Sequence, residues 1–108
     1  MGTTSTVMSV EEYLRYSGKP NAEYIDGILR PKPMPTKPHA EISYALITLL
    51  RRQGVESLGE MTLRMSPTKF LLPDVIADPV IEDPYPTEPV MLCVEILSPE
   101  DRVGAMLA

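Results

Sequence analysis

The chain has 108 residues, of which 44% are hydrophobic, and this is enough to build the core of one small domain without disulfides. We therefore expect a single domain over residues 1–108. The formal net charge of -5 disfavours a sequence-independent grip on phosphate backbones, because such binding depends on many Lys and Arg contacts. It does not exclude a nuclease, since such enzymes concentrate carboxylates at their metal site.

The sequence shows no sign of membrane insertion or secretion. No apolar run approaches the roughly eighteen residues of a membrane span, and residues 1–14 lack the basic start and apolar stretch of a signal peptide. We expect a soluble, cytoplasmic protein. Cys93 is the one cysteine, which excludes an intramolecular disulfide, and its apolar neighbours predict a buried residue and not a catalytic thiol.

The first elements have strong local signals. Ser9 and Glu12 have the spacing of a capping box, which predicts a short helix ending near Gly18. The apolar stretches on either side of Asp26-Gly27 then predict two strands joined by a tight hairpin turn.

A proline-rich connection and a longer helix follow. Residues 31–38 contain four prolines, which prevent regular pairing. Thr36 can cap the next helix, and Gly54 suits a left-handed exit from it. The apolar residues recur at helical spacing and predict a face that packs on a sheet; they are Ile42, Ala45, Leu46, Leu49 and Leu50.

The remaining sequence is typical of strands. Residues 61–66 alternate between apolar and polar side chains and predict a half-buried strand, and residues 75–77 predict another after Pro73-Asp74. After an acidic, proline-rich loop, residues 90–97 form an almost unbroken apolar run, as expected of a central strand covered on both faces. Ser98 and Pro99 then predict the start of a helix.

Glu95 is the one charged residue in this apolar run, and an unpaired carboxylate in such a strand needs compensation, most simply by a cation. Asp74 supplies a second carboxylate at the start of another apolar strand. Carboxylates and backbone carbonyls suit hard cations such as Mg²⁺ or Mn²⁺. We expect Asp74, Glu95 and the backbone of Ile96 to bind such a metal, which would serve phosphodiester hydrolysis.

The sequence also resembles a known family. The residues that carry the resemblance lie, in order and spacing, at 22–27, in the proline-rich link to the helix with His39, at 72–75 and at 94–99. They are similar to those of the Uma-two family of bacterial nucleases, which belongs to the restriction-endonuclease-like PD-(D/E)XK class and was formerly a domain of unknown function. The resemblance covers residues 8–101.

The resemblance implies an α/β (α+β mixed) fold, with a mixed sheet flanked by helices, and DNA as the substrate. It implies Asp74 and Glu95 as the catalytic acids and Glu23 as a supporting acid. The motif lysine should stand two residues after the second acid, but Leu97 stands there. The resemblance places this lysine, with a last helix and strand, beyond Ala108, so the chain is expected to be C-terminally truncated and incomplete for activity.

Other interpretations remain open at this stage. His39 is most simply an exposed helix residue, Asp78 is a reserve ligand, and Lys69 could replace the missing lysine. The domain could be a non-catalytic binding or assembly module of the same fold, or an interaction domain in which a buried Arg or Lys neutralises Glu95. An exposed strand edge would also favour a homodimer.

Overall fold

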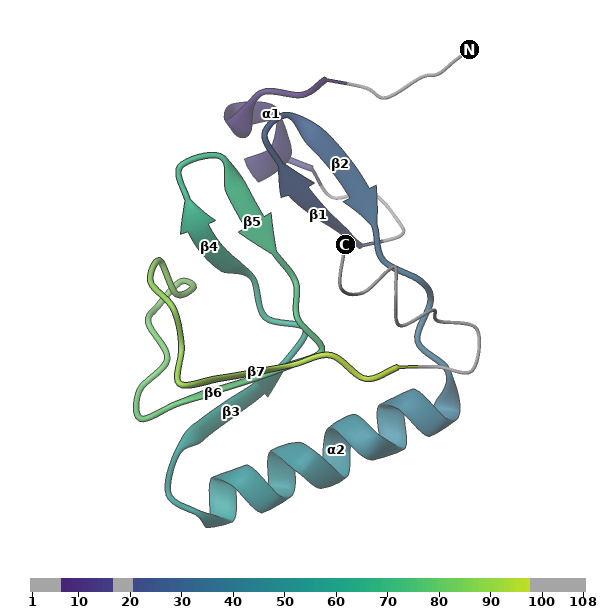
Figure 1. Ribbon diagram of the computed structural model, residues 1–108, viewed down its shortest axis with the longest axis vertical. Coiled ribbons are helices and arrows are strands. Elements are labelled where there is room, and N and C mark those ends of the chain that lie inside the picture. Colours follow the sequence, from purple (N-terminus) through teal and green to yellow (C-terminus); the bar gives the residue numbers. More distant parts are fainter. Residues whose placement is uncertain (1–6, 17–20, 98–108) are drawn as a thin grey trace.

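The computed structural model describes residues 7–16 and 21–97, and these residues form an α/β arrangement of helices and antiparallel strands. Figure 1 shows two sheets, with α2 running along the outer side of one of them. The elements in chain order are α1 (Val10–Leu14), β1 (Ala22–Ile25), β2 (Ile28–Pro31), α2 (Lys37–Arg52), β3 (Glu56–Gly59), β4 (Leu63–Ser66), β5 (Lys69–Leu71), β6 (Val75–Asp78) and β7 (Leu92–Val94).

The first sheet consists of two hairpins joined side by side, in the order β2-β1-β5-β4. The predicted turn between β1 and β2 is confirmed, because Asp26 and Gly27 both adopt positive φ, at 49° and 92°. Tyr24 pairs with Phe70 where the hairpins meet. The capping box of α1 is also confirmed, and this helix adds the ring of Tyr13, whose centroid is 4.9 Å from that of Tyr24 and 5.1 Å from that of Phe70.

The second sheet has the order β3-β6-β7, and α2 packs against β3 and β6. All three residues Val75, Ile76 and Ala77 are fully buried, as their apolar sequence predicted. Ser57 on β3 is also buried and donates its hydroxyl to the carbonyl of Ile76 at 3.0 Å. This hydrogen bond satisfies a polar group in the core next to the start of β6.

The described strands therefore pair as two antiparallel sheets, where the resemblance implied one mixed sheet. The chain passes from the first sheet to the second through Leu72 and Pro73, between β5 and β6. Proline has no N–H to donate to a sheet, so regular pairing is interrupted at this point. The sequence prediction missed β3, since residues 56–59 carry no clear alternation of apolar and polar side chains.

The expectation for the apolar run of residues 90–97 was wrong in the described part of the chain. The strand β7 lies at the edge of its sheet, where it pairs with β6 alone. Cys93 is exposed and not buried. An apolar sequence reports what a strand can bury, whereas its position in the sheet depends on partners elsewhere in the chain. The helix predicted from Ser98 and the helix end near Gly18 lie outside the described residues.

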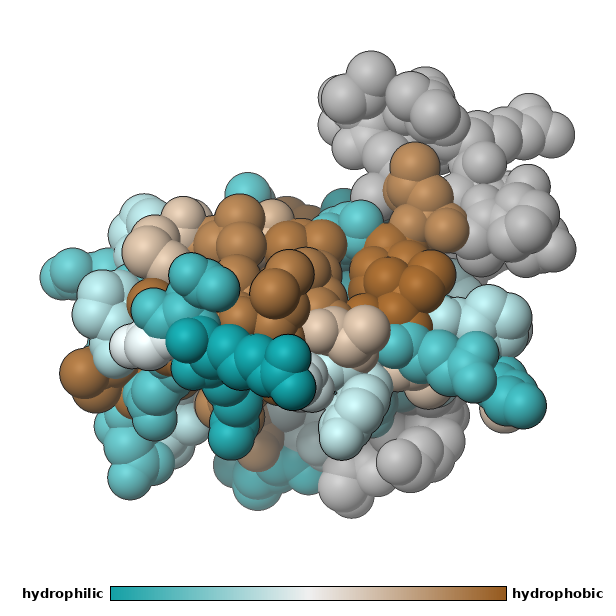
Figure 2. All heavy atoms as spheres, turned by 90° about the horizontal axis from the view of Figure 1, so that it is seen from below, coloured by the Kyte–Doolittle hydropathy of each residue, from teal (hydrophilic) through white to brown (hydrophobic). Residues whose placement is uncertain are grey.

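The helix α2 begins after its cap Thr36, as predicted, but its apolar surface is wider than the face that contacts the sheet. Leu46 and Leu50 are half-buried, whereas Ile42 and Leu49 are 51% and 55% exposed. Figure 2 views the molecule from the side on which α2 lies and shows hydrophobic side chains gathered there. Among the described residues no helix has the length and apolar character needed to cross a membrane.

Candidate functional site

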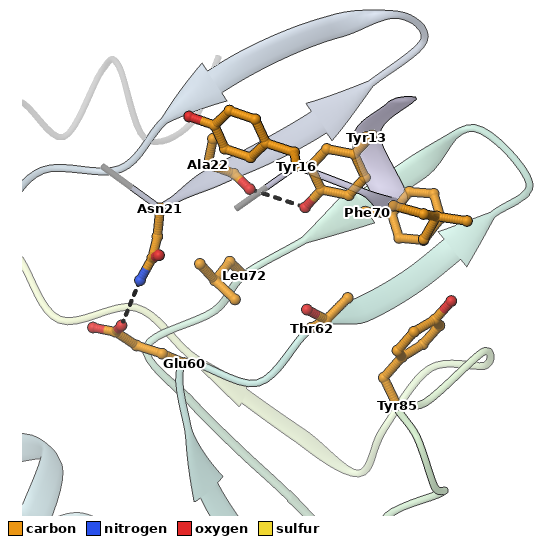
Figure 3. A pocket seen from close by; sticks show the side chains of 10 residues that line it. Tyr13, Tyr16, Asn21, Ala22, Glu60, Thr62, Phe70, Leu72 and Tyr85 are labelled. Atoms are coloured by element: carbon orange, nitrogen blue, oxygen red, sulfur yellow. Dashed lines mark hydrogen bonds between the residues drawn. The ribbon is translucent and has the colours of Figure 1, made fainter. Parts of the chain in front are cut away.

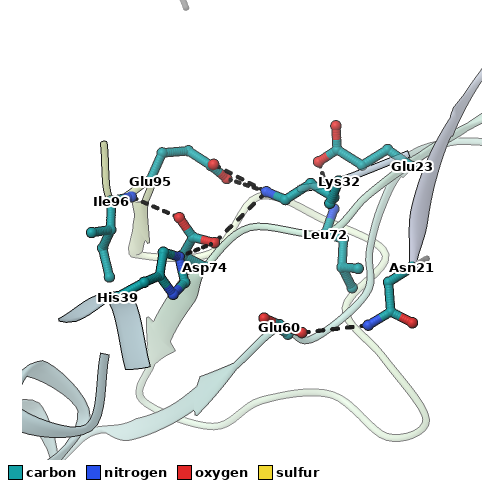
Figure 4. Close-up of polar contacts among 9 residues, drawn as sticks. All are labelled: Asn21, Glu23, Lys32, His39, Glu60, Leu72, Asp74, Glu95 and Ile96. Carbon is teal, nitrogen blue, oxygen red and sulfur yellow. Dashed lines mark hydrogen bonds and ion pairs between the residues drawn. The ribbon is translucent and has the colours of Figure 1, made fainter. Parts of the chain in front are cut away.

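Asp74 is the buried centre of a polar cluster at the junction of the two sheets. It stands just before β6 and is 5% exposed. Its Oδ2 accepts the backbone N–H of Ile96 at 2.7 Å, and its Oδ1 lies 3.0 Å from Nε2 of His39. These contacts hold the carboxylate of Asp74 in one orientation (Figure 4).

Glu95 joins the same cluster from the residue after β7. Both of its carboxylate oxygens accept hydrogen bonds from Nζ of Lys32, at 3.2 and 3.1 Å. The same Nζ lies 3.8 Å from Oδ1 of Asp74. Figure 4 shows the ammonium group reaching between the two acids from the stretch that follows β2. The predicted pair therefore converges on one point, and that point holds a cation supplied by the chain itself.

Glu23 connects the first sheet to this cluster. It lies on β1, and its Oε2 accepts the backbone N–H of Leu72 at 2.8 Å. Leu72 stands two residues before Asp74, so the hydrogen bond fixes the segment that delivers Asp74 to the site. The structure thus places all three predicted acids close to one another, with Glu23 acting on the backbone next to Asp74.

The electrostatics of the cluster are dominated by its carboxylates. Burial by itself lowers the pKa of the Lys32 ammonium, but the hydrogen bond to Glu95 and the surrounding negative charges raise this pKa above its ordinary value. Burial raises the pKa of the Glu95 carboxyl, and the hydrogen bond and charge of Lys32 offset this rise in part. For the pKa of Lys32 the surrounding carboxylates therefore outweigh burial, whereas for the pKa of Glu95 burial is the largest cause.

Sequence reasoning gave too little weight to two members of the cluster. His39 was expected to be exposed, yet its side chain is 17% exposed and contacts Asp74. Lys32 lies in the proline-rich stretch of residues 31–38, and nothing in the local sequence shows that it reaches Glu95, which is distant in sequence. The sequence did offer one indication, because the interpretation as an interaction domain required a Lys or Arg partner for Glu95.

The two residues considered as alternative site residues, Asp78 and Lys69, lie away from the cluster. Asp78 is at the far end of β6, where its Oδ1 accepts the N–H of Met91 at 3.2 Å. Lys69 is exposed beside the turn between β4 and β5, and it pairs with Ile25 and Ser66 along the first sheet. Neither residue is therefore placed to act together with Glu95 in the cluster.

The oxygen atoms of the cluster can be compared with the ligands that a metal ion needs. Within the described residues no group of three or more His, Cys, Asp or Glu side chains is arranged to hold a metal. Two carboxylates do converge, however, and Mg²⁺ is commonly held through one or two carboxylates with water completing its shell. Ile96 contacts Asp74 through its N–H, which places its backbone beside the pair. The residues present fit a hard cation with a sparse protein shell.

An open pocket of about 410 Å³ lies beside the cluster (Figure 3). Aromatic side chains form much of its wall, and an Asn21 to Glu60 hydrogen bond of 3.5 Å borders it. Leu72 links the pocket to the polar cluster, because its N–H donates to Glu23 and its side chain lines the pocket. The other lining residues are Tyr13, Leu14, Tyr16, Ala22, Thr62, Phe70 and Tyr85.

Comparisons with known proteins agree with the sequence resemblance. The Uma2 family, described as "Putative restriction endonuclease", matches residues 10–105. No curated protein matches the chain. A solved structure titled as that of "a putative nuclease belonging to DUF820" from Anabaena variabilis superposes with a TM-score of 0.68 at 20% identity. The alignment covers 93% of this chain and 64% of that one, so the likeness shows a shared fold and this chain spans less than two thirds of its relative.

Proposed function

Because this chain belongs to the Uma2 family, we propose that it is a metal-dependent nuclease that hydrolyses phosphodiester bonds of nucleic acid, with DNA as its substrate. The observation that carries the proposal is the convergence of Asp74 and Glu95 on a single cation position, marked by Nζ of Lys32. In metal-dependent cleavage of nucleic acid a cation lies at the reacting phosphate, and the carboxylates that meet at this point would attract it.

The three acids, His39 and the backbone of Ile96 each have a role in the proposal. Asp74 and Glu95 would hold Mg²⁺ or Mn²⁺, with the backbone of Ile96 beside them. When bound, the metal would supply an activated water and neutralise charge on the phosphate. His39 and the Ile96 N–H orient Asp74, and Glu23 fixes the backbone two residues before it. This preorganisation keeps the acids in place before a metal or substrate arrives.

Metal binding and DNA cleavage test the proposal. We expect titration calorimetry to show Mn²⁺ binding to the wild-type protein and its loss in Asp74→Asn and Glu95→Gln, because each change removes one charged ligand. Mn²⁺-dependent nicking of plasmid DNA should disappear in the same variants. Glu88→Gln is the matched control, since Glu88 is an exposed acid of the proline-rich loop and the charge change is the same. Unchanged Mn²⁺ binding in both Asp74→Asn and Glu95→Gln would contradict the proposal.

The contact between Lys32 and Glu95 favours a second candidate, a binding or assembly module in which this ion pair stands in place of a metal. Thermal unfolding separates the two functions, because a ligand that binds only the folded state raises its stability. The nuclease should gain thermal stability with Mn²⁺ and lose that gain in Glu95→Gln. The module should show no metal-dependent change in either protein.

A further inference from the structure

The cation held by the two proposed metal ligands belongs to the protein. Lys32 donates to both oxygens of Glu95 and lies within ion-pair distance of Asp74. Its side chain is 19% exposed, so most of the side chain is covered by the protein. Its backbone N–H is tied to the carbonyl of Asn21 at 2.8 Å, which fixes the base of the side chain beside β1.

From this arrangement we infer that Lys32 is a tethered competitor for the metal site, whose ammonium group must leave the carboxylates when a divalent cation binds. The inference rests on the proposed function, because it takes Asp74 and Glu95 as the metal ligands. It adds a residue that sets how tightly the metal binds. In the metal-free protein, Lys32 also neutralises part of the negative charge of the site, so the acids are not left unpaired.

The Lys32 ammonium group must move away because it carries a positive charge and occupies the carboxylate oxygens that the metal would use. Both oxygens of Glu95 accept hydrogen bonds from Nζ of Lys32. A divalent cation bound to these oxygens would lie a few ångströms from the ammonium group and would be repelled by it. The lysine side chain has four flexible methylene groups, so its charged end can move while its backbone stays in place.

The contacts that would remain after displacement keep the site in order. Asp74 retains the Ile96 N–H at 2.7 Å and His39 at 3.0 Å when Lys32 moves away. Exchange of one cation for another therefore needs movement of a single side chain and leaves the carboxylate of the buried acid where it is. Metal affinity in the wild-type protein is then the intrinsic affinity reduced by the occupancy of Lys32.

Replacing Lys32 with a neutral side chain of similar length tests the competition. We expect Lys32→Met to bind Mn²⁺ about tenfold more tightly than the wild type, which lies within the usual range of coupling between two ligands. Lys32→Arg, which keeps the charge, should remain near the wild-type affinity. Lys69→Met changes the net charge equally at an exposed position away from the cluster and should also leave the affinity unchanged.

A second measurement does not depend on the variants being folded. In the wild-type protein, nuclear magnetic resonance should show the Lys32 side-chain signals shifting when Mg²⁺ is added, while those of Lys69 stay in place. Static Lys32 signals during metal binding would overturn the inference.

The calorimetric outcomes distinguish the two claims. Equal affinity in the wild type and Lys32→Met, or weaker binding in Lys32→Met, would overturn the competition and leave the nuclease proposal standing. A gain in Lys32→Arg as large as that in Lys32→Met would also overturn it, because the effect would then come from packing and not from charge. Absence of binding in the wild type and in Lys32→Met would overturn both.

Discussion

The two sheets of this molecule differ in how their strands are brought together. In the first sheet β1 pairs with β2 and β4 pairs with β5 through short turns. In the second sheet β3 and β6 pair although the whole β4–β5 hairpin lies between them in sequence, and β7 follows β6 after a long loop. Each hairpin of the first sheet is local, and only the pairing of β1 with β5 joins residues far apart in sequence, whereas in the described part of the chain the second sheet contains no tight hairpin.

This difference matters because the candidate site belongs mainly to the second sheet. Asp74 and Glu95 flank β6 and β7, and their partners come from the stretch after β2 and from the first turn of α2. Contacts between distant segments form at a higher cost in chain entropy than those within a hairpin. The first sheet still contributes to the site, because Glu23 lies on β1 and Lys32 directly follows β2.

The largest expected effect comes from breaking the aromatic core of the first sheet. Phe70 is fully buried, lies against Tyr13 and Tyr24, and has the Arg64 guanidinium 4.6 Å from its ring centroid. Phe70→Ala should lower the free energy of unfolding by about 3–5 kcal/mol, because it removes the ring and leaves a cavity. Urea denaturation measures the change. Tyr44→Ala, at an exposed position of α2, should have little effect, and similar losses in both variants would contradict this prediction.

A smaller effect is expected at the link between the sheets. Glu23→Ala leaves the Leu72 N–H without its carboxylate partner and should lower the free energy of unfolding by about 1–3 kcal/mol. If the nuclease proposal holds, it should also weaken Mn²⁺ binding, because the backbone leading to Asp74 is no longer fixed. Glu23→Gln keeps an oxygen acceptor and should recover part of the stability. Equal stability of the alanine variant and the wild type would show that the sheets are joined without this contact.

The smallest effect concerns pH and the second sheet. Burial raises the pKa of Glu95 above its ordinary value of 4.5. The folded protein therefore binds the proton of the Glu95 carboxyl group more tightly than the unfolded chain does. The resulting stabilisation is present below the ordinary pKa and is lost as the pH rises through the folded-state pKa. Glu95→Gln cannot ionise, so its free energy of unfolding should rise relative to that of the wild type as the pH rises above 4.5.

Urea denaturation across this pH range measures the trend. Glu88→Gln, which alters an exposed acid, should follow the wild type at every pH. A relative gain for Glu95→Gln toward low pH would contradict the sign of the shift.

Local signals in the sequence predicted the elements that depend on few residues. The capping box at Ser9, the Asp26-Gly27 turn and the Thr36 cap are all present in the structure. Each of these features is decided by side chains within a few positions of one another, so the sequence alone is sufficient. The predicted acids also lie together, with their roles in metal binding still resting on the experiments above.

Other features could not be predicted because they depend on neighbours in space. The apolar run containing Cys93 predicted a central strand, yet β7 lies at a sheet edge in the described residues. On α2, the spacing of Ile42 and Leu49 predicted packing, while the sheet contacts a different part of the helix surface. Periodicity shows that an element is amphipathic, but it does not show which neighbour covers it or how widely.

By itself the sequence determined the local elements, the family and the acids that stand out from their surroundings. The tertiary structure decided what neutralises those acids. Lys32 meets Glu95 and His39 meets Asp74 because a hairpin, a proline-rich stretch and a helix bring them to the junction of two sheets. The physical reason is that hydrogen bonds and ion pairs act over a few ångströms, and a linear sequence records no such distances between remote residues.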